Sequence, residues 1–365
     1  MDPVGPVARR FPLVARARPA CGPLNARVGE LCVLADAAKR SGNPASASAV
    51  FNQAALLASD VGLPDLARAW CHRHADAYLR ARPLGAQAAR HALEPLVNLA
   101  RLHIRDGDGD AALRLLTGLY EAVTGRADTI LDDLPVSAET LTSTTEDHRE
   151  VCQWLWGVLL AEGARALTSV GRWHDALTHL QRHHGVGRRM LDGRQVAVIA
   201  STTVGDADGA LALLADTMPG EPWENAVTTC LNVLCRRSAH RLVEADLSVM
   251  VERYRQFVPA SGLAVFGTRL GLSVIDAAGG VEHPGARGIA AVLIQRASQD
   301  GYAAREVLAH EGCAALLTDE QARALAEVLD ACALGSQILP ARLTTDLSTA
   351  LNTSEAVLSR ALHVR

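Results

Sequence analysis

The chain has 365 residues, of which 49% are hydrophobic and 21% charged, proportions typical of a soluble globular protein and not of a disordered one. Its formal net charge of −4 argues against a nucleic-acid or membrane-surface binder, and no run of eighteen apolar residues predicts a membrane span. The length exceeds that of one ordinary core, so two domains or an extended repeat array is expected.

The amino-acid composition also indicates the class of fold. Aromatic residues make up only 4% of the chain, so a core of Ala, Leu and Val is expected, which suits helices packed on helices. Lys39 is the one lysine among many arginines, a bias typical of a GC-rich bacterial genome. Eight cysteines without a CxxC pair predict reduced, buried thiols in a cytoplasmic protein.

In chain order, residues 1–25 are rich in Pro and Arg and predict a flexible N-terminal arm. From there on, apolar residues recur at helical spacing, and Gly, Pro, Asp or Asn interrupt them. Short connections between helices favour antiparallel neighbours. The predicted helices cover residues 26–41, 45–60, 64–81, 86–105, 109–125, 148–170, 173–185, 192–203, 207–217, 222–237, 241–256, 259–278, 285–299, 301–311, 318–334, 339–350 and 353–363.

Five of the interruptions share a spacing in which a glycine precedes, by five residues, an alanine that begins an apolar run. These pairs are Gly42 and Ala47, Gly62 and Ala67, Gly107 and Ala112, Gly171 and Ala176, and Gly205 and Ala210. The last two glycines are 34 residues apart. The pattern resembles the tetratricopeptide repeat, a helix-turn-helix unit of that length with Gly at the turn and a small residue early in the second helix. Other repeat positions are matched by Ala100, Ala164, Leu116, Leu180 and Leu214.

The resemblance covers residues 26–217, and residues 218–365 are expected to continue the array because their helical period persists. The other glycine spacings are irregular, which indicates divergent units. We therefore expect an all-α fold of antiparallel helix hairpins stacked as a tetratricopeptide-like α-solenoid.

Residues 124–147 interrupt the rhythm with a proline, several threonines and a group of acids. This composition disfavours a continuous helix, and long irregular connections in compact arrays are often functional. Asp132 and Asp133 are compatible with a magnesium-diphosphate motif, but no third acid follows in register. The preferred interpretation is a solvated insertion.

The stretch "GRWHDALTHLQRHHGVGRR", residues 171–189, holds four histidines in a chain that is acidic overall. His179 and His183 are spaced to share a metal ion, but the stretch holds no cysteine, and Arg182 and Arg188 would repel a cation. A patch for anions or acidic peptides and a polar helix face are the alternatives, and the polar face of an outer helix is preferred. No metal site is predicted.

The sequence lacks the common motifs for catalysis and nucleotide binding. The sequence has no GxSxG, no Walker loop and no GxGxxG after a strand. No catalytic residue and no cofactor are therefore predicted, and a non-catalytic protein is favoured over an enzyme.

The resemblance implies that partners bind in a concave groove lined by the first helix of each hairpin. Asn and Arg at such positions suit an extended peptide, because an amide binds main chain and a guanidinium binds carboxylate oxygens. Ordinary exposed polar residues are the alternative interpretation. The candidate partner-binding residues are Asn52, Asn98, Arg101, Glu162, Arg165, Arg194 and Gln195.

Two functional hypotheses follow. The first is a non-catalytic helical-repeat protein that binds a peptide or protein segment, an acidic one among the candidates, as a scaffold or as a sensor or regulatory accessory. Nucleic acid and membrane are not expected partners, and a homo-oligomer is compatible with the pattern. The second is a cytosolic enzyme or enzyme accessory that acts on a peptide or other natural product, with the 124–147 insertion as a lid.

Overall fold

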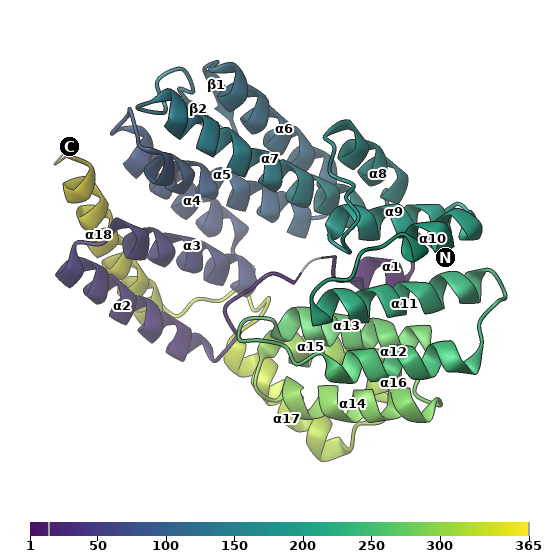
Figure 1. Ribbon diagram of the computed structural model, residues 1–365. Helices are drawn as coiled ribbons and strands as arrows, with labels where there is room; N and C mark the ends of the chain where they lie inside the picture. Colours follow the sequence, from purple (N-terminus) through teal and green to yellow (C-terminus); the bar gives the residue numbers. More distant parts are fainter. Residues whose placement is uncertain (14, 364–365) are drawn as a thin grey trace. The chain divides into compact units, whose positions relative to one another are not determined.

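The computed structural model describes residues 1–13 and 15–363, and the fold is all-α, with 71% helix and 2% strand. The chain divides into two compact units (Figure 1). Unit 1 comprises Met1–Gly22 and Leu167–Cys332, and unit 2 comprises Pro23–Ala166 and Ala333–Arg365. Each unit is built of helix hairpins stacked in the manner of tetratricopeptide-like solenoids.

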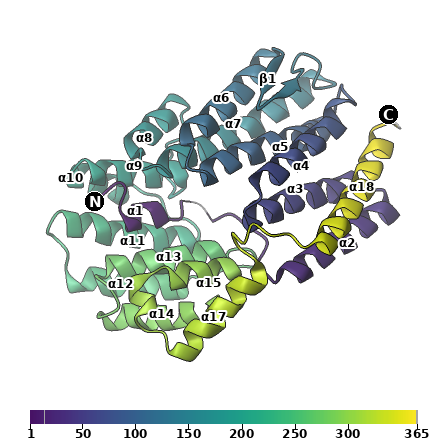
Figure 2. The ribbon, with the colours of Figure 1, turned by 180° about the vertical axis from the view of Figure 1, so that it is seen from behind.

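Unit 2 is a stack of helices in which each of the first four packs against the next along the chain. The long C-terminal helix α18 returns to pack against α2, α3 and α4, as both ribbon views show (Figures 1 and 2). One apolar core runs through the unit and includes residues of α7 and α18. The helices are α2 (Leu24–Ser41), α3 (Pro44–Val61), α4 (Pro64–Leu79), α5 (Ala86–Arg105), α6 (Gly109–Gly125), α7 (Thr145–Thr168) and α18 (Ala341–His363).

Unit 1 continues the hairpin pattern, with α8 packed on α9, α9 on α10, α10 on α11 and α11 on α12. The helix α13 packs on α14, and α15 packs on α17. The helices are α1 (Pro6–Arg10), α8 (Trp173–Arg182), α9 (Asp192–Thr203), α10 (Ala207–Ala215), α11 (Pro222–Ser238), α12 (Glu244–Gln256), α13 (Ala264–Ala277), α14 (Pro284–Ala297), α15 (Gly301–Leu308), α16 (Glu311–Ala314) and α17 (Asp319–Cys332).

The glycine and alanine pairs of the sequence lie where the repeat pattern requires them. All five glycines adopt a left-handed backbone, and the five alanines are fully buried. At Gly107, φ is +79° and an added Cβ would meet no neighbouring atom, so the backbone conformation alone explains the preference for glycine. Its partner Ala112 is buried, and a small side chain there allows close packing.

The predicted helices closely follow the observed ones, with four main differences. The helix expected from residue 259 begins at Ala264. The two helices expected over residues 339–363 are one continuous helix, α18, because no Gly or Pro separates them. The short helices α1 and α16 were not expected, since four or five residues are too few for a periodic pattern.

The connection between α6 and α7 contains a short antiparallel hairpin. Strands β1 (Thr129–Leu131) and β2 (Leu134–Val136) pair through Ile130 and Pro135, and Leu131 packs on Gly118 of α6. Asp132 and Asp133 form the two-residue turn with φ of +50° and +63°. Positive φ at both positions is typical of the tight turns that suit a hairpin, and Asp tolerates it.

The N-terminal residues make specific contacts within unit 1. The indole Nε1 of Trp173 donates to the carbonyl of Pro3 at 3.1 Å, and Arg10 forms an ion pair with Asp276 at 2.6 Å. The amide of Arg18 donates to the carbonyl of Gly262 at 2.9 Å. Flexibility of residues 1–25 stays a prediction, and these contacts count against it.

Candidate functional site

The candidate site is a row of polar side chains on α5 and its neighbours α3 and α7. Glu94, Asn98, Arg101 and Arg105 follow one another on α5 at intervals of four, three and four residues, so they share one face of the helix. Core residues such as Leu96 and Leu99 occupy the rest of the helix. Burial of the apolar faces thus fixes where this polar face points.

Amide groups connect α3 to α5. The side chain of Asn52 donates from Nδ2 to Glu94 Oε2 at 3.0 Å and accepts at Oδ1 from Asn98 Nδ2, also at 3.0 Å. Asn98 Oδ1 in turn accepts from Arg101 Nη1 at 3.0 Å. Each amide therefore donates and accepts, which fixes its orientation.

A carboxylate between two guanidinium groups connects α5 to α7. Glu162 Oε1 accepts from Arg101 Nε at 3.0 Å and from Arg101 Nη2 at 2.6 Å. Glu162 Oε2 lies 3.7 Å from Nη1 of Arg165. The side chain of Glu162 is 1% exposed, whereas those of Arg101 and Arg165 are 42% and 47% exposed. We call Asn52, Glu94, Asn98, Arg101, Glu162 and Arg165 the polar ladder.

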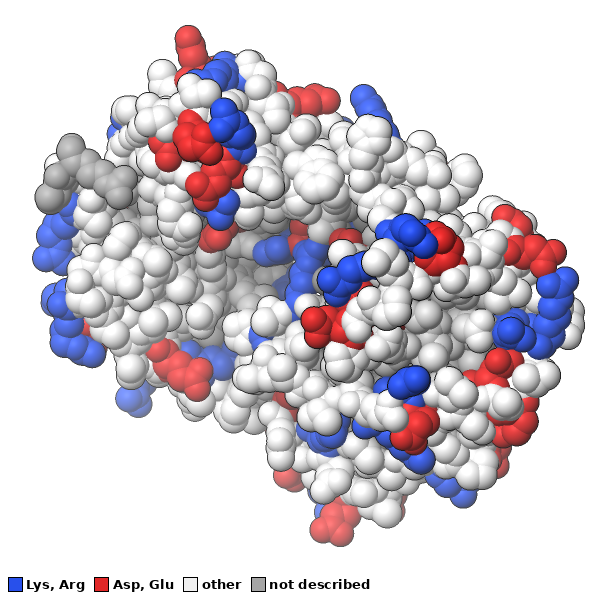
Figure 3. Space-filling model, in the orientation of Figure 1, with Lys and Arg blue, Asp and Glu red and all other residues white. Residues whose placement is uncertain are grey.

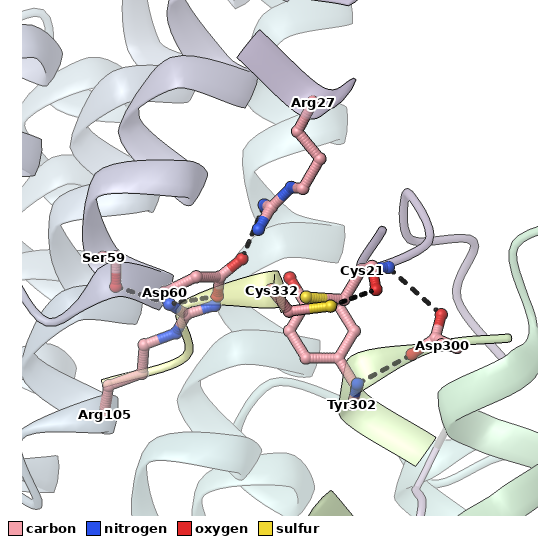
Figure 4. Close-up of polar contacts among 8 residues, drawn as sticks. All are labelled: Cys21, Arg27, Ser59, Asp60, Arg105, Asp300, Tyr302 and Cys332. Carbon is pink, nitrogen blue, oxygen red and sulfur yellow. Dashed lines mark hydrogen bonds and ion pairs between the residues drawn. The ribbon is translucent and has the colours of Figure 1, made fainter. Parts of the chain in front are cut away.

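Further ion pairs extend the same side of α5 at both ends. Arg90 pairs with Glu150 of α7 at 2.9 Å. At the other end, Arg105 Nη1 contacts Asp60 Oδ1 at 3.1 Å, and Arg27 Nη2 donates to Asp60 Oδ2 at 2.8 Å (Figure 4). The carboxylate of Asp60 thus joins α2, α3 and α5, as Glu162 joins α5 and α7.

Charge within the polar ladder is balanced. Burial raises the pKa of Glu94, but the neighbouring His91 and the hydrogen bond from Asn52 outweigh this, so the pKa lies below its usual range. Glu94 and Glu162 offset the charges of Arg101 and Arg165. Acidic and basic side chains also occur in small mixed groups on the face drawn in Figure 3.

The structure brings five of the seven sequence-predicted residues together: Asn52, Asn98, Arg101, Glu162 and Arg165. Arg194 and Gln195 lie in unit 1 and are buried. Arg194 donates to Asp216 at 3.1 Å and to the carbonyl of Leu213 at 2.7 Å, and its part in partner binding stays a prediction.

The register explains this difference. Asn98 precedes its turn glycine by nine residues, as Glu162 does, whereas Arg194 precedes Gly205 by eleven. Two residues rotate a side chain by about 200° around a helix, so Arg194 points to the opposite side of its helix from the equivalent polar position.

Sequence reasoning missed Glu94, Arg105 and Asp60. The helical spacing of Glu94, Asn98 and Arg101 was a usable signal, because it marks a polar stripe on an otherwise apolar helix. Asp60 gave no such signal, since it is a single carboxylate at the end of α3.

The insertion packs against the rest of unit 2 on another side of α5. Asp132 contacts Arg68 of α4, and its oxygens lie 3.4 Å from Nε2 of both His72 and His103. Residues 101 and 103 lie about 200° apart around a helix, so the turn docks away from the face that carries Arg101. The side chain of Asp132 is 13% exposed, whereas the neighbouring Asp133 is exposed, so the solvated insertion expected from the sequence is docked at this one residue.

The histidine-rich stretch forms α8 and the turn that follows it. Trp173, Ala176 and Leu180 are its buried positions, whereas His174 and Arg182 are exposed. The rings of His179 and His183 lie 5.0 Å apart. Within residues 1–13 and 15–363, no group of three or more His, Cys, Asp or Glu is placed to hold a metal ion, and no helix is long and apolar enough to span a membrane.

Comparison with known families gives one match in this part of the chain. Residues 96–129 match the tetratricopeptide repeat. The matched segment runs from the second half of α5 through α6 and includes Asn98 and Arg101 as well as the turn at Gly107. Comparisons with curated proteins and with solved structures give no match.

Proposed function

We propose that this tetratricopeptide-like helical-repeat protein is a non-catalytic scaffold that binds an extended peptide or protein segment along the polar ladder of unit 2. Repeats of this type generally mediate protein-protein interactions. The ladder lies on α3, α5 and α7, and Asn98 and Arg101 fall within the matched repeat.

The observation that carries the proposal is the pair of hydrogen-bonded amides, Asn52 and Asn98, next to Arg101. Side-chain amides offer both a donor and an acceptor to a peptide backbone. Their mutual bond holds them in place before a ligand arrives, which lowers the entropy lost on binding.

The charged half of the ladder favours a segment that carries a carboxylate. Arg101 and Arg165 are partly exposed, and the buried carboxylate of Glu162 lies between them. Glu162 limits the repulsion between the two guanidinium groups, and both side chains are partly exposed, so a ligand carboxylate can be bound between them.

An array of unstructured peptides of acidic, neutral and basic composition tests the proposal. We expect wild-type protein to retain a subset of extended, acid-containing peptides and the Asn52→Ala/Asn98→Ala variant to lose at least tenfold in affinity for them. Arg114→Ala is the matched control, because Arg114 is exposed on α6. Equal retention by wild type and the Asn variant, with both folded by circular dichroism, would refute the site.

A further inference from the structure

Cys21 and Cys332 each lie at the C-terminal end of one of the two stretches of chain that form unit 1. The unit is made of two stretches of chain, Met1–Gly22 and Leu167–Cys332. Cys21 is the penultimate residue of the first stretch, and Cys332 is the last residue of the second. The two cysteines therefore mark two of the points at which the chain leaves this unit.

The backbone of Cys21 is held at the N-terminus of α15. Its amide donates to Asp300 Oδ2 at 3.2 Å, and its carbonyl accepts from the amide of Gly301 at 2.8 Å. Asp300 is 4% exposed and also accepts from the amide of Tyr302 at 2.8 Å. The backbone of Cys21 is thus held in place by the buried side chain of Asp300, which also caps α15.

The sulfur atoms of Cys21 and Cys332 both lie against Gly301, which has no side chain. Cys332 Sγ donates to the carbonyl of Cys21 at 3.0 Å (Figure 4). A Cβ placed on Gly301 would stand 2.7 Å from Cys332 Sγ and 3.2 Å from Cys21 Sγ. Both sulfurs therefore pack on the same bare backbone and lie within about 6 Å of each other, and a disulfide bond requires them to approach to about 2 Å.

We propose that Cys21 and Cys332 are a modification site that forms a disulfide in the presence of a disulfide oxidant such as oxidised glutathione. The thiolate of one cysteine attacks a glutathione sulfur and releases one glutathione thiolate. The second cysteine then attacks the mixed disulfide and releases another. Two protein thiols lose two protons and two electrons, and one glutathione disulfide becomes two glutathiones.

Burial sets the rate of this reaction. Both cysteines are 1% exposed, so an oxidant reaches them only when the N-terminal stretch opens from α15. Once formed, the bond joins the two stretches of unit 1 and closes a long loop, which restricts the unfolded chain. The oxidised protein is therefore more resistant to unfolding than the reduced protein.

The test is peptide mapping of the full chain, without reduction, after incubation with oxidised glutathione in buffer and in mild urea. We expect a linked peptide pair containing Cys21 and Cys332, formed several-fold faster in urea, and a melting temperature that rises by a few degrees and returns on reduction. Cys21→Ser and Cys332→Ser should each abolish the linked pair and the shift.

Cys230→Ala is the matched control, because it removes another buried thiol of unit 1, and it should leave the linked pair intact. Cys21 and Cys332 that remain thiols in both conditions, or that link to other cysteines instead of each other, would overturn the proposal. Peptide mapping reads the bond directly, so a serine variant that folds poorly does not affect the result with wild type.

Discussion

Glu162 on α7 accepts two hydrogen bonds from Arg101 on α5, at 3.0 and 2.6 Å, through one carboxylate oxygen. The carboxylate is buried while the guanidinium is partly exposed. This contact combines a structural role, joining two repeats, with the presentation of a cation at the surface.

Replacing Glu162 with Gln should destabilise the protein by about 2 kcal/mol, because a charged hydrogen-bond acceptor is lost at a buried position. Arg101 and Arg165 would also lose the negative charge between them. Urea unfolding followed by circular dichroism measures the change. The control is Glu150→Gln, which removes a half-exposed partner of Arg90 on the same two helices and should cost less than about 0.5 kcal/mol. Equal effects of the two changes would contradict the role given to Glu162.

Asp132→Asn should release the hairpin turn from α4 and α5. Asn tolerates the positive φ of this position, so the change removes charge without straining the turn. We expect faster hydrogen exchange in residues 129–136 and unchanged exchange in the helices. Asp133→Asn is the matched control, since Asp133 has the same backbone conformation and is exposed. Unchanged exchange in the Asp132 variant would show that its contacts do not hold the turn.

The same docking should persist to acidic pH. Burial raises the pKa of Asp132, but Arg68, His72 and His103 together hold it below its usual range. A lowered folded pKa stabilises the docked turn above the unfolded pKa, and this contribution is lost as pH falls through the folded pKa. Hydrogen exchange of residues 129–136, corrected for intrinsic rates, should therefore change little between pH 7 and pH 5.

His74 should make unit 2 less stable in mild acid. Burial lowers its pKa to about 3 from 6.5, and its ring stacks on Phe51. Below pH 6.5 the imidazole of His74 is protonated in the unfolded chain, but in the folded chain it stays neutral down to about pH 3. The free energy of unfolding therefore decreases as the pH falls across that window. Between pH 7 and pH 5 this contributes a loss of about 2 kcal/mol.

His74→Phe keeps an aromatic ring against Phe51 and removes the titrating group. Urea unfolding at pH 7 and pH 5 should therefore show a smaller pH dependence in the variant than in the wild type. An identical pH dependence in both would mean that His74 is not the group responsible.

Sequence reasoning predicted the helices well because two independent signals agreed. Periodic apolar residues marked the helices other than the short α1 and α16, and the glycine before a buried alanine marked five of the turns, as at Gly107 and Ala112. The hairpin at 129–136 was missed because three residues per strand give no detectable alternation, and its turn carries Asp-Asp in place of a glycine.

The site was partly predictable for a related reason. Counting from the turn glycine placed Asn98 and Glu162 on equivalent positions, and both belong to the polar ladder. Arg194 precedes its turn glycine by two residues more than Asn98 and Glu162 precede theirs. Two residues turn a helical side chain to the opposite side of the helix, and Arg194 is buried. The partners Glu94 and Asp60 depend on how neighbouring helices pack, which no single sequence segment specifies.

The most direct test of the peptide-binding proposal is the affinity of wild type and Arg165→Ala for one acid-containing peptide selected from the array, measured by fluorescence anisotropy at low and high salt. Arg165 is 47% exposed at the end of the polar ladder, so it can meet a ligand carboxylate without unfolding the network. We predict that the variant binds about tenfold more weakly at low salt and with a flatter salt dependence, because one screened ion pair is lost. Equal affinity and equal salt dependence in two folded proteins would contradict the assignment of the polar ladder as the partner site.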